Sequence, residues 1–395
     1  MHSVAYILAL IGVVAWLYLL FAHGGFWRVS QLRAAVPPTR AVDGIIAVVI
    51  PARDEAPVIG ATVQSLLLQS GSSDIQVILV DDHSSDDTAE AARSAAEACG
   101  RPQALEVIAA QNLPVGWTGK LWALQQGIAR ATELAPKYLL LTDADIKHSS
   151  ENVATLVAIA EAGSYDLASF AVKLHCSSFA EKLLIPAFVF FFFMLYPPRW
   201  IRDSRRRTAG AAGGCMLVNP AALENAGGIA AIRGQIIDDC ALARAIKRSG
   251  GRIWLGITPD THSMRAYGSF AEIERMIART AFNQLQHLAI LLLGTILGLA
   301  LIYVAPAALL LSGDSALALM GALGWLLMTI AYLPMIRFYG LGRLWALSLP
   351  FSAVFYMFAT VHSAAKYWSG RGGEWKGRTQ DHLHAEASTT TKGQR

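Results

Sequence analysis

Residues 137–145 read KYLLLTDAD, a short apolar run that ends in two acidic residues. Its length and composition predict a buried parallel strand over Lys137–Leu141, with an Asp-Ala-Asp segment leaving the end of that strand. Two earlier runs have the same form: Ile45–Ile50 is followed by PARDE, and Ile75–Val80 is followed by DDHS. The chain therefore places polar, mostly acidic loops after three predicted strands.

Helical patterns alternate with these strands at Val58–Leu68, Asp87–Cys99 and Lys120–Thr132, and Asp86 or Asp87 is the expected N-cap of the second helix. This alternation predicts an α/β fold with a doubly wound, Rossmann-like sheet whose ligands bind beyond the carboxyl ends of the strands. The three acidic loops would then meet in one crevice. No GxGxxG follows the first strand, which argues against a dinucleotide dehydrogenase.

The composition indicates a membrane protein. Of the 395 residues, 54% are hydrophobic and only 16% are charged, whereas soluble domains have about 45–50% and 25%. The net charge of +4 is modest, and no segment has the interleaved basic and aromatic residues of a nucleic-acid surface. The four cysteines lack metal-ligand or CxxC spacing, so we expect reduced thiols in a cytosolic domain: Cys99, Cys176, Cys215 and Cys240.

The first apolar run, Val4–Ala22, is uncharged and long enough to cross about 30 Å of hydrocarbon. A cleaved signal peptide is the alternative, but the run has no basic segment before it and no small-residue cleavage pattern after it. The cations Arg28, Arg33 and Arg40 all follow the run. By the positive-inside rule, the N-terminus lies outside and the chain after Ala22 begins in the cytoplasm.

Three further apolar runs close the chain: Leu288–Leu311, Ala316–Ile336 and Leu344–Ala365. Three simple crossings would leave the tail outside, whereas Lys366, Arg371, Lys376 and Arg378 favour a cytoplasmic tail. A re-entrant segment would resolve this conflict, and the first run is the candidate because glycines and a proline interrupt it.

A shorter apolar run, Leu183–Tyr196, precedes a cluster of arginines. We interpret it as a helix lying in the cytoplasmic interface, with the arginines reaching lipid phosphates; a buried core helix beside a solvated basic loop is the alternative. We therefore expect four parts: a transmembrane anchor over residues 1–24, a cytoplasmic domain over 40–285 that includes the interfacial helix 183–198, a C-terminal transmembrane region over 286–366, and a basic, polar tail over 367–395.

Asp143 and Asp145 can both reach one cation at the strand end. Carboxylate oxygens suit a hard divalent ion such as Mg²⁺ or Mn²⁺, which keeps coordination sites for phosphate oxygens. Asp81 and Asp82, after the second strand, can accept hydrogen bonds from a uracil or ribose. Lys120 begins a predicted helix, where its ammonium and the free backbone N–H groups suit a diphosphate. Solvated turns and a surface lysine are the alternatives for these residues.

Two downstream motifs complete the candidate site. Gly213, Gly214 and Cys215 form a predicted tight turn into a strand, where glycines would let an acceptor or sugar approach the backbone. Asp238 and Asp239 open a helix that runs to about residue 248. Capping explains acidic residues at a helix start, but two of them in a protein with a predicted metal site favour a catalytic base for an acceptor hydroxyl.

Together these motifs resemble glycosyltransferase family 2, from about Ile45 to Arg279, with a further match in WKGR at residues 375–378. The resemblance implies a GT-A fold, a nucleotide-diphosphate sugar donor (often UDP-linked), a divalent metal and inversion at the anomeric carbon. By it, Asp145 binds the metal with Asp143 beside it, and Asp239, next to Asp238, is the base. The implied nucleotide-sugar site contains Pro51, Arg53, Glu55, Asp81, Asp82, Lys120, Asp143 and Arg279.

More narrowly, residues 116–124, 188–197, 213–217 and 278–282 are similar to the hopene-associated glycosyltransferases, a subgroup related to ceramide and carotenoid glycosyltransferases. This similarity implies a multi-pass enzyme of a bacterial inner membrane, with its catalytic domain in the cytoplasm and a membrane lipid, such as a hopanoid, as acceptor. Processive relatives carry Gln/Arg-x-x-Arg-Trp, but Thr280 follows Arg279 here, so we expect a single transfer. A processive polysaccharide synthase and a non-catalytic membrane scaffold are the alternatives.

Overall fold

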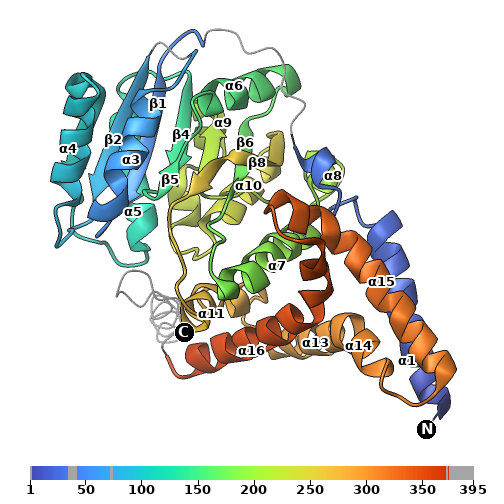
Figure 1. Ribbon diagram of the computed structural model, residues 1–395. Helices are drawn as coiled ribbons and strands as arrows, with labels where there is room; N and C mark the ends of the chain where they lie inside the picture. The colour runs from blue at the N-terminus through green and yellow to red at the C-terminus, as the bar shows by residue number, and fades with distance from the viewer. Residues whose placement is uncertain (1, 34–41, 72–73, 371, 373–395) are drawn as a thin grey trace, which may run out of the picture. The chain divides into compact units, whose positions relative to one another are not determined.

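The computed structural model describes residues 2–33, 42–71, 74–370 and 372 (Figure 1). The chain divides into two compact units. The helical unit comprises Met1–Leu32, His175–Arg199 and Ala266–Gly373, and the sheet unit comprises Arg33–Leu174, Trp200–Arg265 and Glu374–Arg395. Each unit is described by itself below.

The sheet unit is built on an eight-stranded sheet. In spatial order its strands are β3 (Leu105–Ala109), β2 (Ile75–Asp81), β1 (Ile46–Ala52), β4 (Tyr138–Thr142), β7 (Cys215–Val218), β6 (Leu167–Lys173), β8 (Ile253–Ser263) and β5 (Ile146–Lys147). The first four strands are parallel. The three strands predicted from the sequence are β1, β2 and β4, which are neighbours, so their acidic loops leave the same edge of the sheet.

The sheet is mixed: its first four strands are parallel, and antiparallel pairs occur in its second half. Strand β7 runs antiparallel to both β4 and β6, and β5 runs antiparallel to β8. The α/β class itself is confirmed.

Helices cover both faces of the parallel strands. Ile46, Val48 and Ile50 of β1 share one hydrophobic core with α3 (Ala56–Leu67), α4 (Thr88–Ala98) and α6 (Asn152–Gly163). The opposite face packs against α5 (Gly119–Thr132), since Val49 and Val80 lie beside Gly127 of that helix. The remaining elements of this unit are η1 (Pro102–Ala104), α9 (Pro220–Asn225), η2 (Ile229–Ile232) and α10 (Asp238–Arg248).

The helical unit contains α1 (His2–Phe21), α2 (Val29–Leu32), α7 (Phe179–Leu195), α11 (Phe270–Ala278), α12 (Ala281–Gln284), α13 (Ala289–Leu299), η3 (Ala300–Val304), α14 (Ala305–Leu309), α15 (Ser315–Phe338), η4 (Arg343–Ser348) and α16 (Leu349–Trp368). Helix α8 (Pro198–Arg202) carries the chain from this unit into the sheet unit. Aromatic side chains fill the interior: Phe190 contacts Tyr332, and Trp16 contacts Tyr303. The Trp16 indole donates a hydrogen bond to the carbonyl of Ile302 at 2.8 Å.

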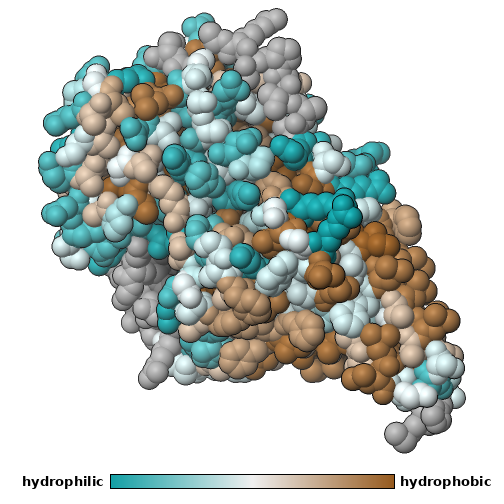
Figure 2. Space-filling model, in the orientation of Figure 1, coloured by the Kyte–Doolittle hydropathy of each residue, from teal (hydrophilic) through white to brown (hydrophobic). Residues whose placement is uncertain are grey.

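The outer surface of the helical unit is apolar, as Figure 2 shows over its helices. Ile7 and Ile11 of α1, Leu319 of α15 and Phe358 of α16 are all exposed. Within the described residues, five helices are long and apolar enough to cross a membrane: Ser3–Phe21, Phe179–Arg202, Ala289–Leu309, Ser315–Phe338 and Arg343–Trp368. Four of them coincide with the predicted spans. The interfacial placement of the helix after Phe179, the re-entrant segment and the four-part division of the chain stay predictions.

The tight approach of α5 to the sheet gives a stability test. A Cβ at Gly127 would lie 2.4 Å from Cγ1 of Val49 and 2.8 Å from Cγ2 of Val80. We expect Gly127→Ala to lower the apparent melting temperature, because overpacking costs about 1–3 kcal/mol. Gly60→Ala in α3 is the matched control, since its Cβ meets only ordinary contacts at 3.5 Å and beyond. A Gly127→Ala protein as stable as the Gly60→Ala protein would contradict this packing.

Candidate functional site

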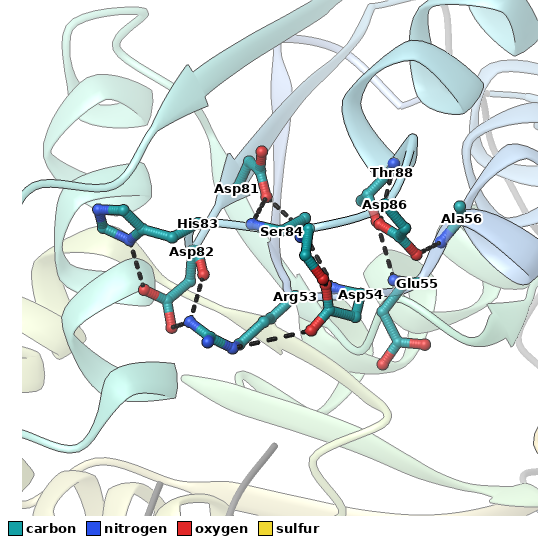
Figure 3. Close-up of polar contacts among 11 residues, drawn as sticks. Arg53, Asp54, Glu55, Ala56, Asp81, Asp82, His83, Ser84, Asp86 and Thr88 are labelled. Carbon is teal, nitrogen blue, oxygen red and sulfur yellow. Dashed lines mark hydrogen bonds and ion pairs between the residues drawn. The ribbon is translucent and has the colours of Figure 1, made fainter. Parts of the chain in front are cut away.

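The loops after β1 and β2 are joined by polar contacts (Figure 3). Nη1 of Arg53 donates a hydrogen bond to the carbonyl of Asp82 at 2.8 Å and lies 3.7 Å from Oδ2 of the same residue. Asp82 is buried, with 2% of its surface exposed. Asp81 accepts a hydrogen bond from the backbone N–H of Ser84 at 3.1 Å. The two aspartates therefore sit at the end of β2 in a fixed loop.

A second set of contacts joins the same loops further from the strands (Figure 3). Asp54 has a positive φ of 52° and accepts a hydrogen bond from the backbone N–H of Ser85 at 2.7 Å. The N–H of Glu55 donates to Oγ1 of Thr88 at 2.8 Å. Pro51 is buried in β1, beyond Val49, where the pairing with β4 ends, so its missing N–H leaves no sheet hydrogen bond unmade. The PARDE segment thus fixes the loop and aims Glu55.

Lys120 links the ends of two elements that are far apart in the sequence. Its Nζ lies 2.8 Å from Oδ1 of Asp143, just after β4, and 3.0 Å from Oδ2 of Asp238, the first residue of α10. Lys120 is held at the start of α5, where the side chain of Thr118 accepts a hydrogen bond from the N–H of Leu121. Burial lowers the pKa of Lys120, but the carboxylates of Asp143 and Asp238 outweigh it and raise the pKa above the ordinary value. The ammonium stays charged.

Asp239 lies beside this pair, in the first turn of α10. Oδ2 accepts a hydrogen bond from the N–H of Gly213 at 2.9 Å, and Oδ1 accepts one from the N–H of Cys240 at 2.7 Å. Burial, and then the charge of Asp238, raise the pKa of Asp239 to about 6, although Lys120 and the two hydrogen bonds act against the shift. The carboxyl group can therefore take up a proton near neutral pH, as a general base requires.

Asp145 is held by residues at the end of β8 and just after it. Its Oδ2 accepts a hydrogen bond from Oγ of Ser263 at 2.9 Å and pairs with Nε of Arg265 at 3.2 Å. Nη2 of Arg265 also lies 2.6 Å from Oε1 of Glu55. One guanidinium therefore bridges the acidic loop after β1 and the acidic segment after β4.

The two glycines lie against the candidate base and the sheet. A Cβ at Gly213 would lie 3.3 Å from Oδ2 of Asp239, and one at Gly214 would lie 3.2 Å from Val172. The thiol of Cys215 is fully buried and accepts a hydrogen bond from Nδ2 of Asn152 at 3.2 Å. Burial raises the pKa of Cys215 to about 12, so this side chain is a neutral part of the interior.

The structure brings together most of the residues singled out from the sequence. They lie in two ion-paired groups. In one group, Lys120 pairs with Asp143 and Asp238, and Asp239 lies beside them. The other group contains Glu55 and Asp145. Arg279 belongs to the helical unit, where it is an exposed residue at the end of α11. Lys376 and Arg378 lie outside the described residues.

Arg265 is the residue that the sequence analysis missed. It lies two positions after Ser263, the last residue of β8. The only sequence signal for its role is that it is a cation in a chain with several acidic loops. Its two carboxylate partners are separated from it by 210 and 120 residues, so no spacing rule connects them.

The site offers few protein side chains that could bind a metal ion. Across the described ranges, no group of three or more His, Cys, Asp and Glu side chains lies close enough to hold a metal ion. Among the described residues, the Asp145 carboxylate nevertheless makes its hydrogen bond and ion pair through Oδ2, which leaves Oδ1 for a metal ion. One or two carboxylates with phosphate and water oxygens is a normal coordination set for Mg²⁺, so this donor set fits a metal bound together with a diphosphate.

Comparison with known proteins finds a family match for part of the chain. Residues 47–227 match the family described as "Glycosyl transferase family 2". Among solved structures, a mannosyltransferase from Pyrobaculum calidifontis, in complex with GDP-Man and Mn²⁺, is 19% identical, covers 90% of this chain and 99% of its own, and superposes with a TM-score of 0.56. This likeness shows the fold.

A second similar structure is glucosyl-3-phosphoglycerate synthase from Mycobacterium tuberculosis, in complex with Mn²⁺, UDP and phosphoglyceric acid. It is 17% identical over 66% of this chain and 82% of its own, with a TM-score of 0.39. No curated protein sequence is significantly similar to the chain. The sheet with its acidic strand ends and the family match agree: the chain carries a glycosyl transferase family 2 domain of GT-A fold, and the protein is a glycosyltransferase.

Proposed function

We propose that this glycosyltransferase moves one sugar from a nucleotide-diphosphate donor to the hydroxyl of a membrane lipid, with inversion at the anomeric carbon and with a divalent metal. The main support is the group formed by Lys120, Asp143, Asp238 and Asp239. In this group the carboxyl group of Asp239, whose pKa is raised, lies beside the acidic residues that follow β4. A base next to a diphosphate site is what direct displacement of a sugar requires.

For the donor, we assign the nucleoside to the loops after β1 and β2. The buried carboxylate of Asp82 would accept hydrogen bonds from the base or ribose, with Asp81, Arg53 and Pro51 holding the loop. The mannosyltransferase of the same fold was solved with GDP-Man, a donor of this chemical class. The resemblance to glycosyltransferase family 2 favours a UDP-sugar as the donor of this chain.

For the diphosphate, we assign Asp145 and Asp143 as metal ligands, and Lys120 as a cation beside them. When bound, Mg²⁺ or Mn²⁺ would neutralise the charge that develops on the departing nucleotide diphosphate. Lys120 would share this role, since its ammonium already lies 2.8 Å from Asp143. Arg279 could add a further cation, as the family resemblance implies. We assign Gly213, which lies against Asp239, and its neighbour Gly214 to the backbone wall of the sugar or acceptor pocket.

In the transfer step, Asp239 would take the proton of the acceptor hydroxyl while the hydroxyl oxygen forms its bond to the anomeric carbon. The bond from that carbon to the diphosphate oxygen breaks on the opposite side, and the electron pair leaves with the nucleotide diphosphate. The N–H groups of Gly213 and Cys240 orient the carboxylate throughout.

The lipid acceptor is supported by the apolar outer surface of the helical unit, whose five candidate spans indicate membrane association. The hopene-associated resemblance favours a polycyclic or polyisoprenoid-type lipid such as a hopanoid. We further propose a bacterial inner membrane with the sheet unit on the cytoplasmic side. A scaffold without catalysis would have no need for the retained acidic residues.

The base assignment is tested by Asp239→Asn. We expect kcat to fall by roughly 100- to 10,000-fold, because general-base catalysis contributes about that much, while donor affinity stays within about twofold. Asp260→Asn, which changes an exposed aspartate of β8, is the control and should leave both unchanged. Loss of donor binding in Asp239→Asn would assign the residue to the donor site instead.

The pH profile follows from the same carboxyl group. Because the base works only when it is ionised and its pKa in the free enzyme is raised to about 6, kcat/KM should fall as the pH drops through about 6. The expected slope is about tenfold per pH unit below that value. Measurement of kcat/KM for the donor from pH 4.5 to 8 checks this. A plateau that extends down to pH 4.5 would be the contrary result.

The metal assignment is tested without turnover. In the presence of nucleotide diphosphate, Mn²⁺ binding measured by electron paramagnetic resonance should weaken by more than about tenfold in Asp145→Asn. Asp260→Asn again serves as the control. Equal Mn²⁺ affinity in the two variants would show that Asp145 is not a ligand.

Product analysis separates the single-transfer reading from the processive one. Purified enzyme in lipid nanodiscs, given a radiolabelled nucleotide sugar and bacterial membrane lipids, should yield organic-soluble product with one sugar per lipid by mass spectrometry. A ladder of oligomers would indicate a polysaccharide synthase instead.

A further inference from the structure

The segment that follows the apolar helix α7 carries an exposed cluster of arginines. Arg202, Arg205, Arg206 and Arg207 all lie on the surface, and the Arg205 side chain is 91% exposed. Asp203 is the one acidic residue among residues 202–207, which leaves a local net charge of +3. Hydrogen bonds from Arg205 lower the pKa of Asp203, so this carboxylate is ionised and orders the loop without neutralising it.

Lys247, near the end of α10, holds this loop from inside. Its Nζ donates hydrogen bonds to the carbonyls of Ile201 at 2.6 Å, Thr208 at 2.8 Å and Asp203 at 3.0 Å, and more weakly to that of Trp200 at 3.4 Å. Burial lowers the pKa of Lys247, and the nearby charge of Asp203 opposes the shift. Because Lys247 donates hydrogen bonds to carbonyls at both ends of the loop, it holds the two ends together. The carbonyls point inward to Lys247, and the arginines are left on the outside.

Two features suit this loop to the surface of a bilayer. The Arg206 guanidinium lies over the Trp200 ring, 4.5 Å from its centre, and tryptophan prefers the boundary between hydrocarbon and water. The candidate membrane span Phe179–Arg202 ends in this loop. Arg207 is therefore at most about 18 Å of extended chain from the end of an apolar helix, whatever the arrangement of the two units.

We propose that residues 200–208 form a docking surface for the headgroups of anionic phospholipids, preformed by Lys247. Guanidinium groups bind phosphate oxygens through paired hydrogen bonds, and each cation near an anionic surface adds about fivefold in affinity. Helix α10 carries Lys247 near one end and Asp239 at the other, so docking fixes the helix that bears the base. Only this last link rests on the proposed function.

Native mass spectrometry of the full chain in detergent, titrated with phosphatidylglycerol or phosphatidylcholine and without any donor, tests the docking surface. The double variant Arg205→Gln/Arg207→Gln should weaken phosphatidylglycerol binding by about 25-fold and leave phosphatidylcholine binding unchanged. The control is Arg93→Gln/Arg130→Gln, which removes two arginines that also pair with surface carboxylates. It should bind phosphatidylglycerol as the unmodified chain does.

Hydrogen exchange of the amides of residues 200–208 tests the role of Lys247. In nanodiscs that contain phosphatidylglycerol, these amides should exchange several-fold more slowly than in phosphatidylcholine alone, and inorganic phosphate at equal concentration should not reproduce the effect. Lys247→Met should abolish the difference, whereas Lys247→Arg, which keeps the charge, should retain most of it.

The proposal is overturned if both double variants lose phosphatidylglycerol affinity equally, if neither does, or if inorganic phosphate protects the loop as well as the lipid. All readouts are made without donor, so a failure here is independent of whether Asp239 is the base.

Discussion

The ion pairs of Lys120 with Asp143 and Asp238 are the contacts on which the candidate site depends. Without this ammonium, the carboxylate at the end of β4 and the carboxylate at the start of α10 would repel each other. With it, the two elements meet, and Asp239 is carried beside the acidic strand end. Arg265 does the same for Glu55 and Asp145 on the other side. Two cations thus gather four acidic side chains, beside which we propose that the charged donor binds.

The same cations set the chemical character of the site. Burial and the charge of Asp238 raise the pKa of Asp239, and the charge of Lys120 opposes this shift. The resulting pKa is about 6. In the proposed role of base, a carboxyl group with that pKa is mostly ionised at neutral pH and can still hold a proton after the transfer. Helix α10 carries Asp239 in its first turn and Lys247 in its last turn. The contacts of Lys247 with its loop therefore help to fix the position of the helix that carries Asp239.

The sequence was sufficient for what local patterns control. The strands β1, β2 and β4, the helix from Asp238 to Arg248 and four of the five candidate spans follow from hydrophobic periodicity and length. Contacts between distant segments do not follow from local patterns: no spacing in the sequence indicates that Lys120 bridges Asp143 and Asp238, or that Arg265 pairs with two distant carboxylates. The antiparallel course of β7 also escaped, because strand direction depends on its partners rather than on its own four residues.

The acid limb of the pH profile in Lys120→Met tests the electrostatic core of this account most directly. Lys120 lowers the pKa of Asp239, so removal of its charge should move the midpoint of the limb, measured on kcat/KM for the donor, from about 6 to a higher pH. Lys137→Met, which removes an ammonium paired with Glu161, should leave the midpoint in place. An unchanged or lower midpoint in Lys120→Met would contradict the coupling between Lys120 and Asp239.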